Sequence, residues 1–146
     1  MAELPDGVHG RIQTHCERGD ALAEGEDYPA ALEEYWAGWD LLPEPKTDWE
    51  SATWLLAAIG DANFLGDDFA AGRDNLALAM RCPGAVGNPF LHLRLGQCHF
   101  ELGDLDRAAD ELARAYALEG PDLFDDEDEK YLAHLQTRLD PPPGGW

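Results

Sequence analysis

Positive charge is scarce in this sequence, because only ten of its 146 residues are Lys or Arg whereas thirty are Asp or Glu. The formal net charge of −20 at pH 7 disfavours direct binding to nucleic acid or to an anionic membrane surface. The same charge favours a cationic partner, such as the basic face of another protein, and it also promotes solubility. We therefore expect a protein or peptide partner of basic character, and neither a nucleic acid nor a membrane.

Long apolar runs are also missing. Charged residues interrupt the first twenty positions, at Glu3, Asp6, Arg11 and Glu17, so the apolar core of a signal peptide is not present. No stretch approaches the roughly 18 apolar residues of a membrane span. The three cysteines are odd in number and widely spaced, which argues against a disulfide framework. Together these absences predict a cytoplasmic location.

Motifs for metal, nucleotide or nucleophilic chemistry are absent as well. The sequence contains no CxxC, HExxH or zinc-finger spacing, and no glycine-rich loop that would cradle a phosphate. His92, Cys98 and His99 fall on one predicted helix, and we interpret the histidines as packing residues. We thus expect a non-enzyme with no catalytic residue, metal or cofactor. An enzyme built around these three residues is retained as an alternative.

A spaced pattern of small and large residues occurs three times in the chain. Gly96 is followed at fixed distances by Leu105, Ala108, Leu112, Ala115 and Gly120. The same distances lead from Gly60 to Phe69, Gly72, Leu76, Ala79 and Gly84, and from Gly19 to Tyr28, Ala31, Tyr35, Gly38 and Pro43. Small residues let two helices approach closely, and the large residues between them fill the remaining space. The pattern therefore predicts three pairs of packed helices.

This pattern resembles the tetratricopeptide repeat, a helix pair of about 34 residues. In the positions of that repeat, the three glycines hold position 8 and the large residues hold 17 and 24. The resemblance extends over roughly residues 11–121 and is strongest in the third copy, which also has Gly103 at its turn. The chain departs from the family pattern at position 4 (His15, Leu56, His92) and at position 11 (Leu22, Asn63, His99). The resemblance implies an all-α, right-handed superhelical stack of helix hairpins.

The predicted organisation is an irregular lead-in over residues 1–10, one helical domain over 11–140, and a Pro/Gly tail over 141–146. Repeats are expected at about 12–45, 53–86 and 89–122, followed by a capping helix at about 122–139. Individual helices are expected at about 11–24, 28–42, 48–65 and 69–80, with two more inside 89–117. Residues 47–50 read as a capping box, Asn88-Pro89 as a helix start, and the acidic run 125–129 as the first turns of the capping helix.

The resemblance also implies a concave groove lined by positions 2, 5, 9, 12 and 13 of the first helix in each pair. Those positions are Gln13, Cys16, Asp20, Ala23 and Glu24, then Trp54, Ala57, Asp61, Phe64 and Leu65, then Phe90, Leu93, Gln97, Phe100 and Glu101. The family's known clamp for a C-terminal carboxylate uses Lys, Arg and Asn at such positions, whereas this chain has Asp, Glu and Gln. A peptide with an acidic end is therefore expected to be a poor ligand.

We single out nine candidate partner-binding residues, which are Asp20, Glu24, Trp54, Asp61, Leu65, Phe90, Gln97 and Glu101 in the groove and Trp36 outside it. Trp54 and Phe90 can serve as apolar anchors within an acidic rim, which suits a segment whose apolar side chains are flanked by Lys or Arg. The competing interpretation is that Phe64, Leu93 and Phe100 pack between helices, so that only the acidic residues are accessible.

Trp36 occupies repeat position 25, which usually faces solvent. It could contact a partner, a second copy of the chain, or the inserted segment 46–52, and we expect the inserted segment to cover it. The terminal Trp146 is expected either to be disordered or to dock on a neighbour.

We therefore expect a protein–protein interaction module that binds one basic protein partner. A role as an immunity or antitoxin-type inhibitor fits a small acidic protein of this kind. Two alternatives remain: a chaperone for a secreted effector or translocator, and a self-assembling scaffold subunit. The oligomeric state is left open.

Overall fold

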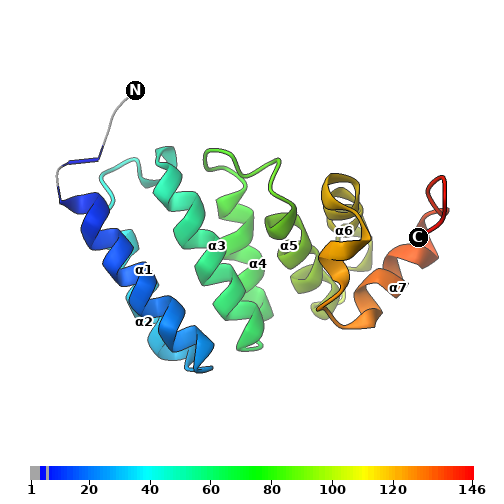
Figure 1. The fold of residues 1–146 in the computed structure, drawn as a ribbon, viewed down its shortest axis with the longest axis horizontal. Helices are drawn as coiled ribbons and strands as arrows, with labels where there is room; N and C mark the ends of the chain where they lie inside the picture. The colour runs from blue at the N-terminus through cyan, green and yellow to red at the C-terminus, as the bar shows by residue number, and fades with distance from the viewer. Residues whose placement is uncertain (1–3, 6) are drawn as a thin grey trace.

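The computed structural model describes residues 4, 5 and 7–146, and every regular element in that part of the chain is helical. Its α-helices are α1 (Val8–Glu24), α2 (Tyr28–Asp40), α3 (Glu50–Leu65), α4 (Phe69–Ala79), α5 (Pro89–Glu101), α6 (Leu105–Glu119) and α7 (Glu129–Arg138). The pairs α1–α2, α3–α4 and α5–α6 follow one another along the molecule, and α7 packs at the far end (Figure 1). The predicted all-α stack of helix hairpins with a C-terminal capping helix is confirmed. None of the described helices is both long and apolar enough to cross a membrane.

The glycine at position 8 of each repeat allows its helix pair to pack closely. A Cβ atom built on this glycine would lie within 3 Å of the large side chain at position 24 of the same repeat. The distances are 2.5 Å from Gly19 to Tyr35, 2.4 Å from Gly60 to Leu76, and 2.9 Å from Gly96 to Leu112. Such contacts are too short for any residue larger than glycine, which explains why the small and large residues recur in register.

The turn inside each pair is built from two consecutive residues. The first has a left-handed backbone, with φ of 63° at Glu26, 64° at Asp67 and 84° at Gly103. The second is an aspartate, and its carboxylate accepts a hydrogen bond from the first turn of the following helix. These N-cap bonds run to Asp27 from Ala30 N (3.2 Å), to Asp68 from Ala71 N (3.2 Å) and to Asp104 from Arg107 N (3.4 Å).

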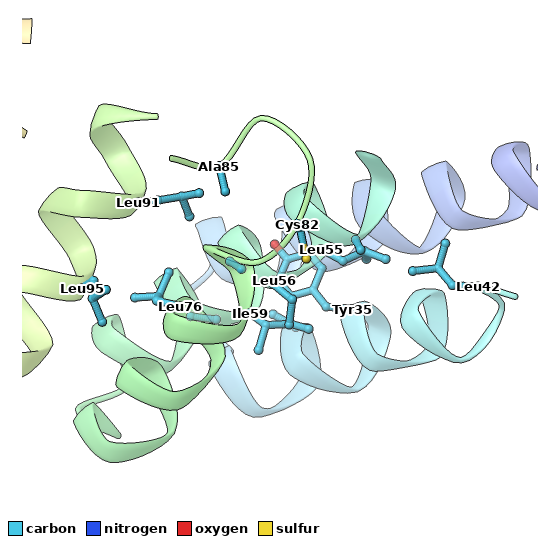
Figure 2. Close-up of a cluster of buried hydrophobic side chains, with 14 of the residues drawn as sticks. Tyr35, Leu42, Leu55, Leu56, Ile59, Leu76, Cys82, Ala85, Leu91 and Leu95 are labelled. Carbon is cyan, nitrogen blue, oxygen red and sulfur yellow. The ribbon is translucent and has the colours of Figure 1, made fainter. Parts of the chain in front are cut away.

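The main core extends from α1 to α5, and Figure 2 shows much of it. Leu55, Leu56 and Ile59 of α3 are completely buried in it, because α3 is packed against helices on both sides. The loop between α4 and α5 covers one end of the cluster with Cys82 and Ala85. A smaller second cluster joins α5 and α6 to Phe124, Tyr131 and Leu135 of the C-terminal segment. The stack thus has two buried clusters, and the second attaches α7 to α5 and α6.

Two predictions near the start of helices were wrong. The lead-in ends earlier than expected, since α1 begins at Val8. The capping box at residues 47–50 does not form, because residues 46–48 make a 3₁₀ turn, η1 (Lys46–Asp48), and Trp49 caps α3 without a side-chain hydrogen bond. The segment instead folds back on the end of α2, where Lys46 Nζ donates to Leu42 O (2.7 Å) and Trp49 Nε1 donates to Pro43 O (2.9 Å).

The predicted capping helix at 122–139 is also corrected. It is divided into a 3₁₀ turn, η2 (Pro121–Phe124), and α7, with most of the acidic run 125–129 in the loop between them. Asp128 caps α7 by accepting a hydrogen bond from Lys130 N (3.0 Å). Glu127 turns inward to meet a buried arginine, and this contact holds the loop away from a continuous helix.

Candidate functional site

The groove formed by α1, α3 and α5 has two halves of different character. In its C-terminal half, Arg94 of α5 lies between two rings, with its guanidinium carbon 4.8 Å from the centre of Phe64 and 5.1 Å from that of Phe90. Arg94 Nε donates to Asp61 Oδ1 at 2.8 Å, and the arginine side chain is only 10% exposed. We call Arg94, Asp61, Phe64 and Phe90 the arginine cluster.

The loop before α7 completes this cluster. Glu127 forms an ion pair with Arg94 and accepts a hydrogen bond from Gln97 Nε2 at 2.7 Å, and Arg94 also donates to Gln97 Oε1 at 2.8 Å. Burial alone would lower the pKa of Arg94, but the carboxylates of Asp61 and Glu127 outweigh it and hold the pKa above its ordinary value. The guanidinium is therefore charged and paired with two carboxylates of the same chain.

Helix α7 covers the remainder of this half. The Tyr131 ring packs 5.4 Å from Phe100 and 6.3 Å from Phe64, and its hydroxyl donates to Glu101 at 2.8 Å. Lys130 pairs with the same carboxylate at 2.6 Å. Burial would raise the pKa of Glu101, but these hydrogen bonds from Lys130 and Tyr131 outweigh it and lower the pKa. Helix α7 and Glu127 thus cover most of the C-terminal half of the groove, and a hollow of about 430 Å³ remains beside Leu65, Glu101 and Lys130.

The N-terminal half of the groove is open. Between α1 and α3 lies a cleft of about 330 Å³, lined by His9, Ile12, Gln13, Cys16, Glu17 and Asp20 of α1 and by Ser51, Trp54 and Ala58 of α3. The Trp54 side chain is 55% exposed. Asp20 accepts a hydrogen bond from Tyr35 OH at 2.6 Å, which fixes its carboxylate beside the cleft. Burial, with help from Asp20 and Glu17, raises the pKa of Cys16 to about 11, so its thiol is neutral near pH 7.

The candidate binding residues fall into two groups, those that the chain itself covers and those that are exposed. Asp61, Phe90, Gln97 and Glu101 are engaged by the arginine cluster and by α7, and Gln97 is completely buried, so it does not line an open groove. Asp20 and Trp54 are exposed and line the open cleft, whereas Glu24 and Leu65 are exposed at the C-terminal ends of α1 and α3 and do not line it.

The outer candidate, Trp36 of α2, is 36% exposed and packs edge-on against Trp39. The expectation that segment 46–52 covers Trp36 was wrong, since the ring is exposed and the hydrogen bonds of that segment run to backbone carbonyls of α2 and of the loop after it. Trp146 is half-buried against Tyr116 of α6, with ring centres 5.4 Å apart. Its docking site is therefore on its own chain.

The histidines on α5 are packing residues, as the repeat positions predict. His92 is buried and bonds Glu111 through Nδ1 and Val86 O through Nε2, both at 2.6 Å. His99 is also buried, and its Nδ1 has no hydrogen-bond partner. Burial raises the pKa of the nearby Cys98 thiol to about 12. Across the described part of the chain, no three His, Cys, Asp or Glu side chains are placed to share a metal ion.

Three residues that organise the groove were missed in the sequence: Arg94, Glu127 and Tyr131. A signal existed for Arg94, which is the one cation among apolar and small neighbours on the first half of α5. No comparable signal exists for Glu127, because five consecutive acidic residues offer equal candidates for its role.

No family model matches this sequence, and the search of curated proteins found no match. Solved structures do match its fold. One is the second tetratricopeptide-repeat domain of human RPAP3, solved in complex with the HSP70 peptide SGPTIEEVD. It has a TM-score of 0.70 and 18% identity, and the match covers 90% of this chain and 97% of that domain. The chain has the tetratricopeptide-repeat fold.

Two further tetratricopeptide-repeat structures agree with it. The first domain of Spaghetti (RPAP3), bound to the HSP90 peptide SRMEEVD, has a TM-score of 0.69 and 20% identity over 88% of this chain and 90% of its own. The Arabidopsis OM64 domain has a TM-score of 0.71 and 18% identity over 90% and 96%. At these identities the likeness concerns the tetratricopeptide-repeat fold alone.

Proposed function

We propose that this tetratricopeptide-repeat domain is a protein–protein interaction module that binds a basic protein segment in the open half of its groove. The observation that carries this proposal is the cleft between α1 and α3, where the exposed ring of Trp54 stands beside the carboxylates of Asp20 and Glu17. An exposed tryptophan in a concave site is a typical interaction anchor. The charge of −20 would steer a cationic partner towards it.

The character of the groove argues against an acidic ligand. The peptides bound to the RPAP3 and Spaghetti domains both end in EEVD. In the C-terminal half of the groove, Arg94 is held by Asp61 and Glu127, and Lys130 is held by Glu101. An incoming acidic terminus would have to displace these carboxylates, so a basic segment is the better ligand.

The small size of the open cleft supports a role as an inhibitor. Since α7 and Glu127 cover most of the C-terminal half, the cleft between α1 and α3 suits a short segment better than an extended chain. A compact basic protein that presents one segment fits this site, and occlusion of that segment would neutralise it. We therefore favour an immunity or antitoxin-type inhibitor acting in the cytoplasm over a chaperone that holds an extended secreted protein.

The test is a pull-down from native cytosol with the full chain at low and high salt. We expect a basic protein that is retained at low salt and lost at high salt. The Trp54→Ala variant should lose it, whereas Trp36→Ala, which removes an exposed ring from the outer face, should retain it. An acidic partner, or a partner lost only in Trp36→Ala, would contradict the proposal, as would the absence of any partner at either salt concentration.

A further inference from the structure

The arginine cluster occupies defined repeat positions. Asp61 holds position 9 of the second repeat, and Phe90 and Arg94 hold positions 2 and 6 of the third. Arg94 therefore bridges two neighbouring repeats, with its guanidinium 5.1 Å from the Phe90 ring centre and 2.8 Å from the Asp61 carboxylate. The cluster shows how this groove holds a guanidinium group: Phe64 and Phe90 supply aromatic faces, Asp61 supplies a carboxylate from the preceding repeat, and Glu127 supplies a second carboxylate.

The same positions one repeat earlier have kept two of these three residue types. Position 9 of the first repeat is Asp20, and position 2 of the second repeat is Trp54. Position 6 of the second repeat is Ala58, where the third repeat has Arg94. The carboxylate and the aromatic ring are thus present, but the arginine between them is replaced by alanine.

The space left by that replacement is the cleft between α1 and α3. Ala58, Trp54 and Asp20 all line it, and its volume is about 330 Å³. Its base is apolar around Ile12, which is buried, and Glu17 adds a second carboxylate to its wall. Asp20 accepts the Tyr35 hydroxyl through Oδ1, so it is fixed in place before any partner arrives.

We propose that this cleft is a socket for one arginine side chain of the bound partner. The guanidinium stacks on Trp54 and pairs with Asp20, as Arg94 does with Phe90 and Asp61 inside the chain. Arginine suits the socket better than lysine, because a planar guanidinium can stack on a ring and donate to a carboxylate at the same time. This inference rests on the proposed function, since the partner supplies the arginine.

The decisive variant is Ala58→Arg, which supplies the missing guanidinium from within the chain. The probe is an acetylated seven-residue peptide with one central arginine between leucines, compared with the same peptide carrying citrulline, which is neutral and nearly isosteric. Binding is followed by the indole N–H resonance of Trp54, assigned from its loss in Trp54→Phe. We expect the arginine peptide to shift this resonance and the citrulline peptide to bind at least about tenfold more weakly.

Ala58→Arg and Asp20→Asn should each abolish the shift caused by the arginine peptide. Ala77→Arg is the matched control, because it adds the same charge at an exposed position of α4 and should bind the peptide as the unmodified chain does. Asp20 is exposed and asparagine is isosteric with aspartate, so Asp20→Asn still tests the socket if Ala58→Arg folds poorly. Equal binding of the two peptides, or full binding by both Ala58→Arg and Asp20→Asn, would overturn the socket.

Different experimental results would contradict the arginine socket and the proposed function. If the unmodified chain captures a basic protein in a salt-dependent manner and Ala58→Arg captures it equally well, the arginine socket is wrong and the interaction module stands. If the unmodified chain captures no basic protein, the proposed function itself is contradicted.

Discussion

At the scale of single residues, the left-handed turn position gives a direct prediction. Glu26 and Asp67 adopt positive φ where the third repeat has Gly103. A left-handed conformation costs a residue with a Cβ atom roughly 1–2 kcal/mol, partly offset by the greater freedom of glycine in the unfolded chain. We expect Glu26→Gly to raise the free energy of unfolding by up to about 1 kcal/mol in urea titrations. Gly103→Ala, the reciprocal control, should lower it by a similar amount, and a loss of stability in Glu26→Gly would contradict this assignment.

Arg94 provides the second prediction. It is buried between two aromatic rings, and removing it leaves the carboxylates of Asp61 and Glu127 without their partner. We expect Arg94→Met to lower the free energy of unfolding by about 3 kcal/mol. Arg107→Met, at an exposed surface pair, should change it by no more than about 0.5 kcal/mol. Similar effects of the two substitutions in denaturant titrations would show that the arginine cluster does not stabilise the fold.

His99 gives a prediction about pH. Burial lowers the pKa of this histidine in the folded state, so the unfolded chain takes up the proton first as the pH falls. The stability contributed by neutral His99 is therefore present above its ordinary pKa of 6.5 and is lost below it. We expect His99→Leu, which also removes the unpartnered Nδ1, to weaken the dependence of unfolding free energy on pH between 7 and 5. An unchanged dependence in His99→Leu would contradict the assignment.

Residue-scale features differ in how well a sequence predicts them. The glycines at position 8 were predictable, because the spacing between Gly19 and Tyr35 recurs identically in the other two repeats. The pairing of His92 with Glu111 was not predicted, although His15 and Glu34 repeat it at the same separation with a 2.7 Å contact. A sequence shows a repeated position readily, but it does not show which polar atoms are directed at each other.

At the scale of elements, the loop before α7 is held by one inward-pointing side chain. Glu127 joins Arg94 and Gln97 of α5 to the C-terminal segment. We expect Glu127→Gln to speed amide hydrogen exchange in α7 by at least about tenfold while exchange in α1–α4 stays the same. Asp126→Asn, at an exposed position of the same loop, is the matched control. Uniform acceleration in all helices, or none in α7, would contradict this local role.

Most helix boundaries followed from signals close in the sequence, such as Asn88 and Pro89 at the start of α5. The failures occurred where distant contacts decide the local structure. Lys46 draws residues 46–48 onto the end of α2, which prevents the capping box, and Arg94 draws Glu127 out of the expected helix across 33 residues of chain. Local propensity carries no information about such contacts.

At the scale of the whole molecule, an acidic groove was predictable but its division was not. Trp54 and Asp20, which the repeat positions assign to the groove, both line the cleft between α1 and α3. The repeat positions also assign Gln97 and Glu101 to the groove, but Glu127 bonds Gln97 and Tyr131 of α7 bonds Glu101. The resemblance fixes where the first helices lie, but it does not reveal how far a C-terminal segment folds back across them.

The central claim is that a basic partner binds in the half of the groove between α1 and α3. Its most direct test is amide hydrogen exchange of the full chain with and without the captured partner at low salt. We expect new protection confined to α1 and α3, with α2, α4 and α6 unchanged. Protection on those outer helices, with α1 and α3 unaffected, would contradict the account.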